Sequence, residues 1–389
     1  MKSILSLFPI LSLLLFTHCD FADTNIDPSR ITEVAPADIL PTILTQTAYN
    51  QSGTLAITAG LITGQLSGFS ASNVSNVSIL FSASSSYWNN QLYGGSLINA
   101  KYLEATATEL DAPHYLAWSK IMLALNYGEA TSYFGAMPYY HALRGAEVRQ
   151  PVYNSQETIY KEVQILLDEA IELLDQPAGA LSPGADDLIF NGDATKWQAT
   201  AYALKARYLS HTSKRQPENW QLILDIIEND AFQESVGQPF FQYTTGRSSN
   251  NPLNKFVIER PNTVVGEESF AQTLIERTDP RFGYYLSEVD FGAYPLYTAN
   301  NDSLVWTRAD ATIPLISLTE LHFLRAEAHY RTEADQSIIE SALATAIRTS
   351  MELVGVTDTA AINQYVAERS NLMDLAGEQV LERIMEEAY

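Results

Sequence analysis

Apolar residues after Pro113 recur every three to four positions, which is the spacing of one face of an α-helix. The pattern predicts a first helix that runs from Pro113 to the region of Gly128 and Gly135. A second helix is predicted to begin with a capping-box pattern, in which Asn154 is followed by Glu157. Both helices have an apolar stripe that must be buried. The two stripes are formed by Tyr115, Trp118, Met122 and Leu125, and by Ile159, Val163, Leu166, Leu167, Ala170, Leu173 and Leu174.

Further helices are predicted on both sides of a less regular region. Asp193 is a favourable N-cap for a third helix, and Pro217 opens a fourth that continues through Ile227. Ser317 and Glu320 form another capping box, and the periodic pattern then returns at 338–354, 361–373 and 378–387. Trp118 on the first helix and Trp197 on the third lie on apolar stripes, so both are predicted core residues. The stripe of the third helix consists of Trp197, Ala201, Leu204 and Tyr208.

Residues 231–315 lack this helical periodicity and contain Gly, Pro, Asn and many aromatic residues. Short strand-like pieces such as Phe256-Val257-Ile258 predict irregular structure that packs on the helices. The fold class is therefore mostly all-α: stacked helical hairpins of the tetratricopeptide kind with a large, loop-rich insertion. The strict repeat consensus is absent, so periodicity alone supports only helical hairpins. We expect one helical domain over residues 42–389.

The first eighteen residues predict a secretory signal, because the apolar run from Ile4 to Phe16 is shorter than the roughly 20 residues of a spanning helix. The run ends next to Cys19, the only cysteine of the chain. A lone cysteine at this place predicts a bacterial lipoprotein that is cleaved and acylated at Cys19. The alternative is cleavage elsewhere, with Cys19 left as a free thiol. Residues 19–41 are polar and proline-punctuated, which predicts a tether.

The formal charge of −23 argues against nucleic acid as a partner, because a polyanion binder needs clustered Lys and Arg. The same charge disfavours anionic lipid head groups and is compatible with neutral or cationic ligands. Gly60, Gly64 and Gly68 repeat every four residues, a spacing that favours helix pairing in membranes. Their stretch is short and contains Thr58 and Thr63, so a closely packed helix of a water-soluble domain is the preferred interpretation.

The sequence contains none of the common catalytic or metal-binding motifs. It has no G-x-S-x-G elbow, no H-E-x-x-H and no phosphate loop. His322 and His329 lie seven positions apart, about 10 Å along one helix, which is too far for shared metal ligation. A glycosidase carboxylate pair has spatial rather than sequential spacing, so the sequence neither supports nor excludes one. We predict a protein that is not an enzyme and that uses no cofactor. No residue is assigned as a metal ligand, and the sequence leaves open whether a metal ion binds.

The best ligand candidate is the polar, aromatic segment 84–95. A flat indole beside amides suits a sugar, since the ring stacks on C–H groups while hydroxyls bond to Asn. Its Ser, Asn and Gly residues predict a loop, where binding residues concentrate; the alternative is that Trp88 anchors the loop to the core. The candidates here are Tyr87, Trp88, Asn89, Asn90 and Tyr93. A second candidate group in the irregular region comprises Tyr294, Tyr297 and Trp306, with core packing as the alternative.

Several strings occur in the order found in one known family. Residues 133–143 (YFGAMPYYHAL) resemble the FGDIPYSEAL segment of SusD/RagB-type lipoproteins, and residues 153–174 resemble the helix that follows it. Residues 187–197 are similar to that family's YNGD..KW stretch, and Asp279-Pro280-Arg281 and the Glu327 helix with Ser350-Met351 fit its later pattern. Ala136 departs from the family's usual Asp. Family members also continue beyond a point like Ile384, so a shortened member is expected.

The resemblance implies a surface-exposed outer-membrane lipoprotein with a tetratricopeptide-like scaffold. Such proteins cap a SusC-like, TonB-dependent β-barrel and deliver a glycan or peptide cargo to it without cleaving it. Two other functions stay open at this point: a helical-repeat scaffold without a small ligand, and a secreted glycoside hydrolase. The sequence names neither the cargo nor the oligomeric state.

Overall fold

A computed structural model describes residues 34–68, 85–234, 237–260, 263–291, 294–298 and 304–389. The chain divides into two compact units, Met1–Ala35 and Pro36–Tyr389. Of the first unit only Val34 and Ala35 are described, so the predicted signal sequence and Cys19 lie outside the described residues. The second unit contains all the helices and strands of the described residues.

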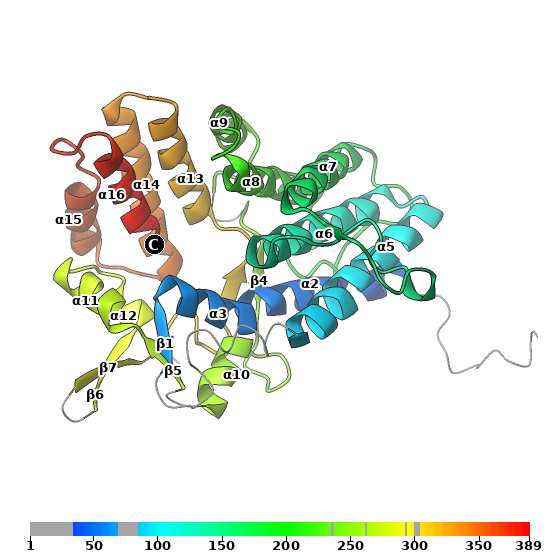
Figure 1. The fold of residues 1–389 in the computed structure, drawn as a ribbon, viewed down its shortest axis with the longest axis horizontal. Helices are drawn as coiled ribbons and strands as arrows, with labels where there is room; N and C mark the ends of the chain where they lie inside the picture. The colour runs from blue at the N-terminus through cyan, green and yellow to red at the C-terminus, as the bar shows by residue number, and fades with distance from the viewer. Residues whose placement is uncertain (1–33, 69–84, 235–236, 261–262, 292–293, 299–303) are drawn as a thin grey trace, which may run out of the picture. The chain divides into compact units, whose positions relative to one another are not determined.

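Helices dominate the second unit, which confirms the predicted fold class (Figure 1). In chain order they are α2 (Pro36–Ser52), α3 (Thr54–Thr63), η2 (Tyr87–Leu97), α5 (Ile98–Glu109), α6 (Pro113–Phe134), η3 (Gly145–Glu147), α7 (Gln156–Leu174), α8 (Ala194–Thr212), α9 (Asn219–Asn229), α10 (Pro252–Glu259), α11 (Glu268–Glu276), α12 (Phe282–Tyr285), α13 (Leu318–Arg331), α14 (Gln336–Val354), α15 (Thr359–Arg369) and α16 (Glu378–Ala388).

Successive long helices pack against each other as hairpins. Each helix from α5 to α9 contacts the next, and α13 contacts α9, so the later hairpins continue the same stack. Figure 1 shows α6, α7 and α8 side by side and α13, α14 and α16 grouped at the other end. This is the tetratricopeptide-like arrangement that the periodicity predicts.

The capping predictions hold at two of three helix starts. The side chain of Asp193 accepts a hydrogen bond from the Lys196 amide at 3.2 Å, and Ser317 accepts one from the Glu320 amide at 3.0 Å. The predicted cap Asn154 is wrong. Ser155 caps α7 instead, through the Thr158 amide at 3.1 Å.

Among the described residues, strands form only two-stranded antiparallel ladders. They pair β1 (Leu66–Gly68) with β5 (Val264–Gly266), β2 (Met137–Pro138) with β3 (Tyr153–Asn154), β4 (Phe240–Gln242) with β8 (Thr312–Pro314), and β6 (Ser287–Phe291) with β7 (Tyr294–Thr298). In the β2–β3 ladder Pro138 lies opposite Tyr153. The region 231–315 therefore has more regular structure than we predicted.

Two local predictions are wrong. The strand-like piece Phe256-Val257-Ile258 lies in helix α10, because Pro252 occupies the first helical turn and the Asn251 side chain caps it. The predicted loop around Trp88 is the π-helix η2. No described helix is both long enough and apolar enough to span a membrane.

Trp118 and Trp197 are fully buried, as predicted. The indole N–H of Trp197 donates to Asp187 at 2.7 Å, and the same carboxylate accepts from the Gly192 amide at 2.9 Å. A buried polar network also joins α2, η2 and α6. Its bonds run from Asn50 to Ser96 at 3.2 Å, from Asn50 to Asn126 at 3.1 Å and from Asn126 to Thr47 at 2.9 Å.

Candidate functional site

Trp88 lies on η2 with its ring half-buried among other aromatic rings. Its centroid is 5.1 Å from that of Tyr93 and 5.3 Å from that of Phe134, which it meets edge-on. Tyr153 is nearly parallel to Trp88, with an interplanar angle of 14° and a centroid distance of 6.5 Å. Trp88 therefore packs against the core and also has an exposed part. The structure is compatible both with ligand contact and with a role in anchoring this segment to the core.

The other candidates on η2 divide between the core and the surface. Tyr87 is only 1% exposed and stacks on Phe134 at 5.8 Å, so it belongs to the core. Burial also raises the pKa of Tyr87. Asn89 and Asn90 are exposed, and within the described part of the chain their side chains make no hydrogen bond. Both amides are available to a ligand.

Tyr93 connects η2 to the β2–β3 ladder. Its hydroxyl donates to the Pro138 carbonyl at 2.6 Å, and burial raises its pKa. The carboxamide oxygen of Asn154 accepts hydrogen bonds from the amides of Tyr139 at 3.1 Å and Tyr140 at 3.3 Å. These bonds fix the strand that carries Tyr153, so Tyr93 is a positioning residue whose own hydroxyl is occupied.

Sequence reasoning missed Tyr153, which is 61% exposed. Tyr133, at 37%, and Tyr140, at 48%, are also exposed. The Tyr140 amide bonds to Asn154, the neighbour of Tyr153, and the Tyr133 ring contacts Phe134, which contacts Trp88. The Tyr140 hydroxyl donates to Glu162 at 2.6 Å. We call Trp88, Tyr133, Tyr140 and Tyr153 the aromatic surface. The signal for Tyr153 was its place in the recognised segment 153–174, but no spacing rule connects position 153 to position 88.

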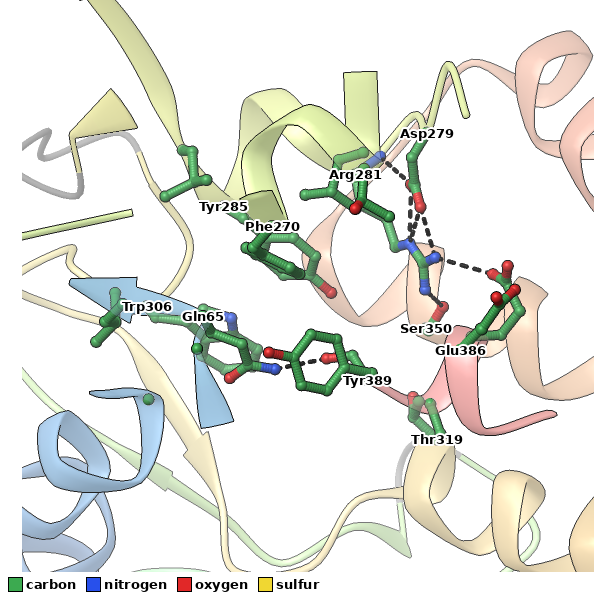
Figure 2. A pocket seen from close by; sticks show the side chains of 18 of the residues that line it. Gln65, Phe270, Asp279, Arg281, Tyr285, Trp306, Thr319, Ser350, Glu386 and Tyr389 are labelled. Atoms are coloured by element: carbon green, nitrogen blue, oxygen red, sulfur yellow. Dashed lines mark hydrogen bonds and ion pairs between the residues drawn. The ribbon is translucent and has the colours of Figure 1, made fainter. Parts of the chain in front are cut away.

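The second candidate group lies elsewhere in the fold. Trp306 is half-buried against the core of the C-terminal helices and lines a cavity of about 880 Å³ (Figure 2). Tyr294 and Tyr297 lie on β7, and their side chains are outside the described part of the structure. No ring contact among the described residues joins Trp306 to the aromatic surface. Trp306 and the aromatic surface therefore lie in separate regions of the fold.

Several titratable groups of the described residues have pKa values that burial shifts. Within the described ranges, no group of three or more His, Cys, Asp or Glu side chains is arranged to hold a metal. Burial lowers the pKa of His322 to about 4, and burial also lowers that of His329, so both are neutral at pH 7. Glu129 is the main exception among carboxylates, because burial raises its pKa to about 7. Its Oε2 atom is buried without a partner in the described structure.

Comparison with known families decides the identity of the scaffold. The family model described as "Starch-binding associating with outer membrane" matches residues 28–389, nearly the whole chain. The chain belongs to this SusD-like family. SusD-like proteins are nutrient-binding proteins associated with the outer membrane, which agrees with the resemblance found in the sequence.

Solved structures support the SusD-like fold. A SusD/RagB family protein from Bacteroides thetaiotaomicron VPI-5482 is 21% identical with a TM-score of 0.71, covering 91% of this chain and 84% of that chain. A SusD homolog from Bacteroides fragilis NCTC 9343 is 20% identical with a TM-score of 0.72, covering 92% and 84%. A structure named as a chitin-binding protein is 21% identical with a TM-score of 0.71, covering 91% and 83%. At this identity the likeness establishes the fold alone. No curated protein sequence matches the chain.

Proposed function

We propose that this SusD-like protein binds a glycan at the aromatic surface and delivers it to a SusC-like, TonB-dependent barrel. The observation that carries the proposal is the pair Trp88 and Tyr153, nearly parallel and partly open, beside the exposed amides of Asn89 and Asn90. Aromatic faces accept the C–H faces of sugars, and amides supply hydrogen bonds that fix orientation. The family description and the chitin-binding relative favour a glycan over a peptide.

The ring geometry indicates different roles for Trp88 and Tyr153. Trp88 has Tyr93, Phe134 and Tyr153 around it, so most of its surface is already in contact with protein. Tyr153 is supported by Trp88 on one side and is 61% exposed. One face of the Tyr153 ring is therefore open to a ligand, and Trp88 packs against its other side. We therefore propose Tyr153 as the main ligand contact, in place of Trp88, the residue favoured by the sequence.

We also propose that the protein is anchored to the outer membrane by a lipid. A lipid on Cys19 would hold the protein at the outer membrane, and the tether would separate it from the bilayer. The tether is shorter than the predicted 19–41, because helix α2 begins at Pro36. Replacement of Cys19 with Ser should move the protein from the membrane fraction to the soluble fraction. Membrane retention of Cys19→Ser, together with a wild-type mass that lacks lipid, would contradict the anchor.

A binding screen tests the functional proposal directly. The chain beginning at residue 20 should be retarded in affinity gels that contain starch or chitin-type polysaccharide, and Tyr153→Ala should be retarded less. Co-purification with a TonB-dependent barrel encoded beside it tests delivery. A protein that binds no glycan in the screen but does bind peptides would favour the peptide cargo, and one that binds neither would favour the scaffold.

A further inference from the structure

A buried polar cluster lies where α2, η2 and α6 pack together, and it consists of Gln51, Tyr87 and Glu129. The Gln51 carboxamide hydrogen-bonds to the Glu129 side chain. Burial, and after it the charge of Glu129, raises the pKa of Tyr87. Within the described structure, Gln51 Oε1, the Tyr87 hydroxyl and Glu129 Oε2 are buried without a hydrogen-bond partner. Buried polar atoms are usually paired, so the cluster needs an explanation.

The cluster has too few hydrogen-bond donors when Glu129 is ionised. The carboxamide oxygen of Gln51 and a carboxylate oxygen can only accept hydrogen bonds, whereas the Tyr87 hydroxyl can donate one. Two unpartnered acceptors then share a single donor. A proton on Glu129 Oε2 turns that atom into a donor, which removes one acceptor and adds the missing donor. Protonation of Glu129 therefore completes the hydrogen bonds of the cluster.

The charges around Glu129 do not compensate for an ionised carboxylate. Arg207 of α8 is a cation whose charge acts on Glu129, but it is already paired with Glu320 of α13. Its Nε and Nη2 atoms both lie 2.5 Å from oxygens of that carboxylate. Burial accordingly raises the pKa of Glu129 to about 7, although Arg207 and Gln51 lower it. The other titratable groups whose interaction with Glu129 is resolved are tyrosines with raised pKa values, namely Tyr87, Tyr133 and Tyr208.

Ring contacts connect the cluster to the aromatic surface. Tyr87 stacks on Phe134 at 5.8 Å, and Phe134 meets Trp88 edge-on at 5.3 Å. Trp88 in turn packs against Tyr153. The Tyr133 ring also contacts Phe134, with a centroid distance of 6.3 Å. A displacement of Tyr87 would therefore move the rings to which we assign glycan binding.

The segment that carries Tyr87 and Trp88 depends on such side-chain contacts. It is the π-helix η2, and no side chain caps its first turn in the described structure. The π-helical geometry is rare and usually limited to a single turn, so it has little stability of its own. Tyr87 is the first residue of η2 and is 1% exposed. Its packing beside Glu129 therefore anchors the start of η2 to α6.

We propose that Glu129 is a positioning residue for the aromatic surface: its protonation holds Tyr87 and the start of η2 in place, and its ionisation loosens them and weakens glycan binding. The inference rests on the proposed function, because the aromatic surface is the site that Glu129 regulates. Glu129 acts through Tyr87 and Phe134 rather than by contact with the glycan. The affinity should decrease as the pH rises from mildly acidic to mildly alkaline values.

Titration calorimetry with maltohexaose and with chitohexaose measures this pH dependence. The measurements at about pH 5.5 and about pH 8.5 lie on either side of the Glu129 pKa of about 7. Wild-type protein should bind the sugar roughly three- to tenfold more weakly at the higher pH, since a pKa change of about half a unit to one unit on binding has this effect. Glu129→Gln should keep the tighter binding at both pH values, because its amide donates at every pH. Glu172→Gln, a change at an exposed residue of α7, is the control and should keep the wild-type pH dependence.

Hydrogen exchange in the sugar-free protein tests the same switch without a ligand. The amides of residues 87–97 should be less protected in wild type than in Glu129→Gln at about pH 8.5, and equally protected in both at about pH 5.5. Comparison of the two proteins at one pH removes the effect of pH on the intrinsic exchange rate. Equal protection at both pH values would overturn the inference.

The two experiments distinguish failure of this inference from failure of the proposed function. Binding that is lost in Tyr153→Ala but has the same pH dependence in wild type and Glu129→Gln would leave the aromatic surface intact and overturn the inference. If neither sugar binds, or if Tyr153→Ala binds as wild type does, the proposed function fails. Equal protection of residues 87–97 would then overturn the inference as well, whereas unequal protection would support control of η2 by Glu129.

Discussion

Gly128 of α6 lies directly against Tyr208 of α8, so closely that a Cβ atom at Gly128 would be 2.3 Å from Cζ of the tyrosine ring. The Tyr208 ring cannot retreat, because it is 1% exposed and its hydroxyl donates to the Leu125 carbonyl at 3.1 Å. The sequence pattern placed Gly128 near the end of its helix. In the structure this glycine is inside α6, which ends at Phe134, and it allows two core helices to approach.

Gly128→Ala should destabilise the protein by about 1–2 kcal/mol. The gain of up to about 1 kcal/mol in helix propensity is outweighed by the cost of overpacking, which is roughly 1–3 kcal/mol. Urea denaturation measures the free energy of unfolding. Gly283→Ala is the control, since a Cβ at Gly283 of α12 would meet no atom within 4 Å. Equal stability of both variants and wild type would contradict this account of the α6–α8 contact.

The buried ion pairs around Arg281 should be important for stability. Its guanidinium donates to Asp279, to Ser350 at 2.9 Å and to Glu387, and it thereby ties the segment before α12 to α14 and α16. Arg281→Met leaves the buried carboxylate of Asp279 without a counter-charge, whereas Glu387 keeps its ion pair with Arg369 at 2.6 Å. The loss should cost about 3–5 kcal/mol. Arg308→Met is the control, because the Arg308–Asp310 pair is exposed and should contribute at most about 1 kcal/mol. Similar melting temperatures for the two variants would contradict this role.

Acid should weaken the same network. Burial alone would raise the pKa of Asp279, but the hydrogen bonds and charge of Arg281 outweigh it and hold that pKa below its ordinary value. A carboxylate with a lowered folded-state pKa stabilises the protein above its unfolded-state pKa, near about 3.9, and this contribution is lost as the pH falls through the folded value. Denaturation below about pH 4 should therefore be less steep in Asp279→Asn than in wild type. An identical acid transition would exclude Asp279 as its source.

Glu129 should have the opposite pH dependence. Burial raises its pKa from 4.5 to about 7, so the folded protein retains a proton that the unfolded chain has already released. Stability should then decrease as pH rises from about 4.5 to 7, by up to about 3 kcal/mol. Glu129→Gln should remove this decrease, as measured by urea denaturation at several pH values. An unchanged pH profile in the variant would show that Glu129 is solvated in solution.

Long-range helical periodicity predicted the scaffold well, and local composition predicted the details poorly. The α7 and α8 stripes were correct because each apolar residue faces one core, and Trp118 and Trp197 lie in it fully buried. Phe256-Val257-Ile258 has strand-like composition, yet the Asn251 cap and Pro252 set a helix there. Three residues are too few for intrinsic propensity to outweigh a cap and tertiary contacts.

Local composition also predicted the structure of the candidate site poorly. Asn, Gly and Ser around Trp88 indicated a loop, but Gly94 lies where a Cβ would be 2.4 Å from the Asn89 carbonyl oxygen. That glycine permits the wide π-helical turn, in which residues five apart approach each other. Tyr153 is far from Trp88 along the chain and reaches it through the β2–β3 ladder, a pairing that no local pattern predicts.

The central claim is that Tyr153 presents the open ring face of a glycan site, and one titration series tests it most directly. Calorimetry with the glycan selected by the affinity screen should give about tenfold weaker binding for Tyr153→Ala, since tens of Å² of lost apolar contact correspond to roughly 1–2 kcal/mol. Its melting temperature should be nearly unchanged because Tyr153 is exposed. Tyr153→Phe and Tyr102→Ala, a change at an exposed tyrosine of α5, should bind as wild type does. Wild-type affinity in Tyr153→Ala would contradict the claim.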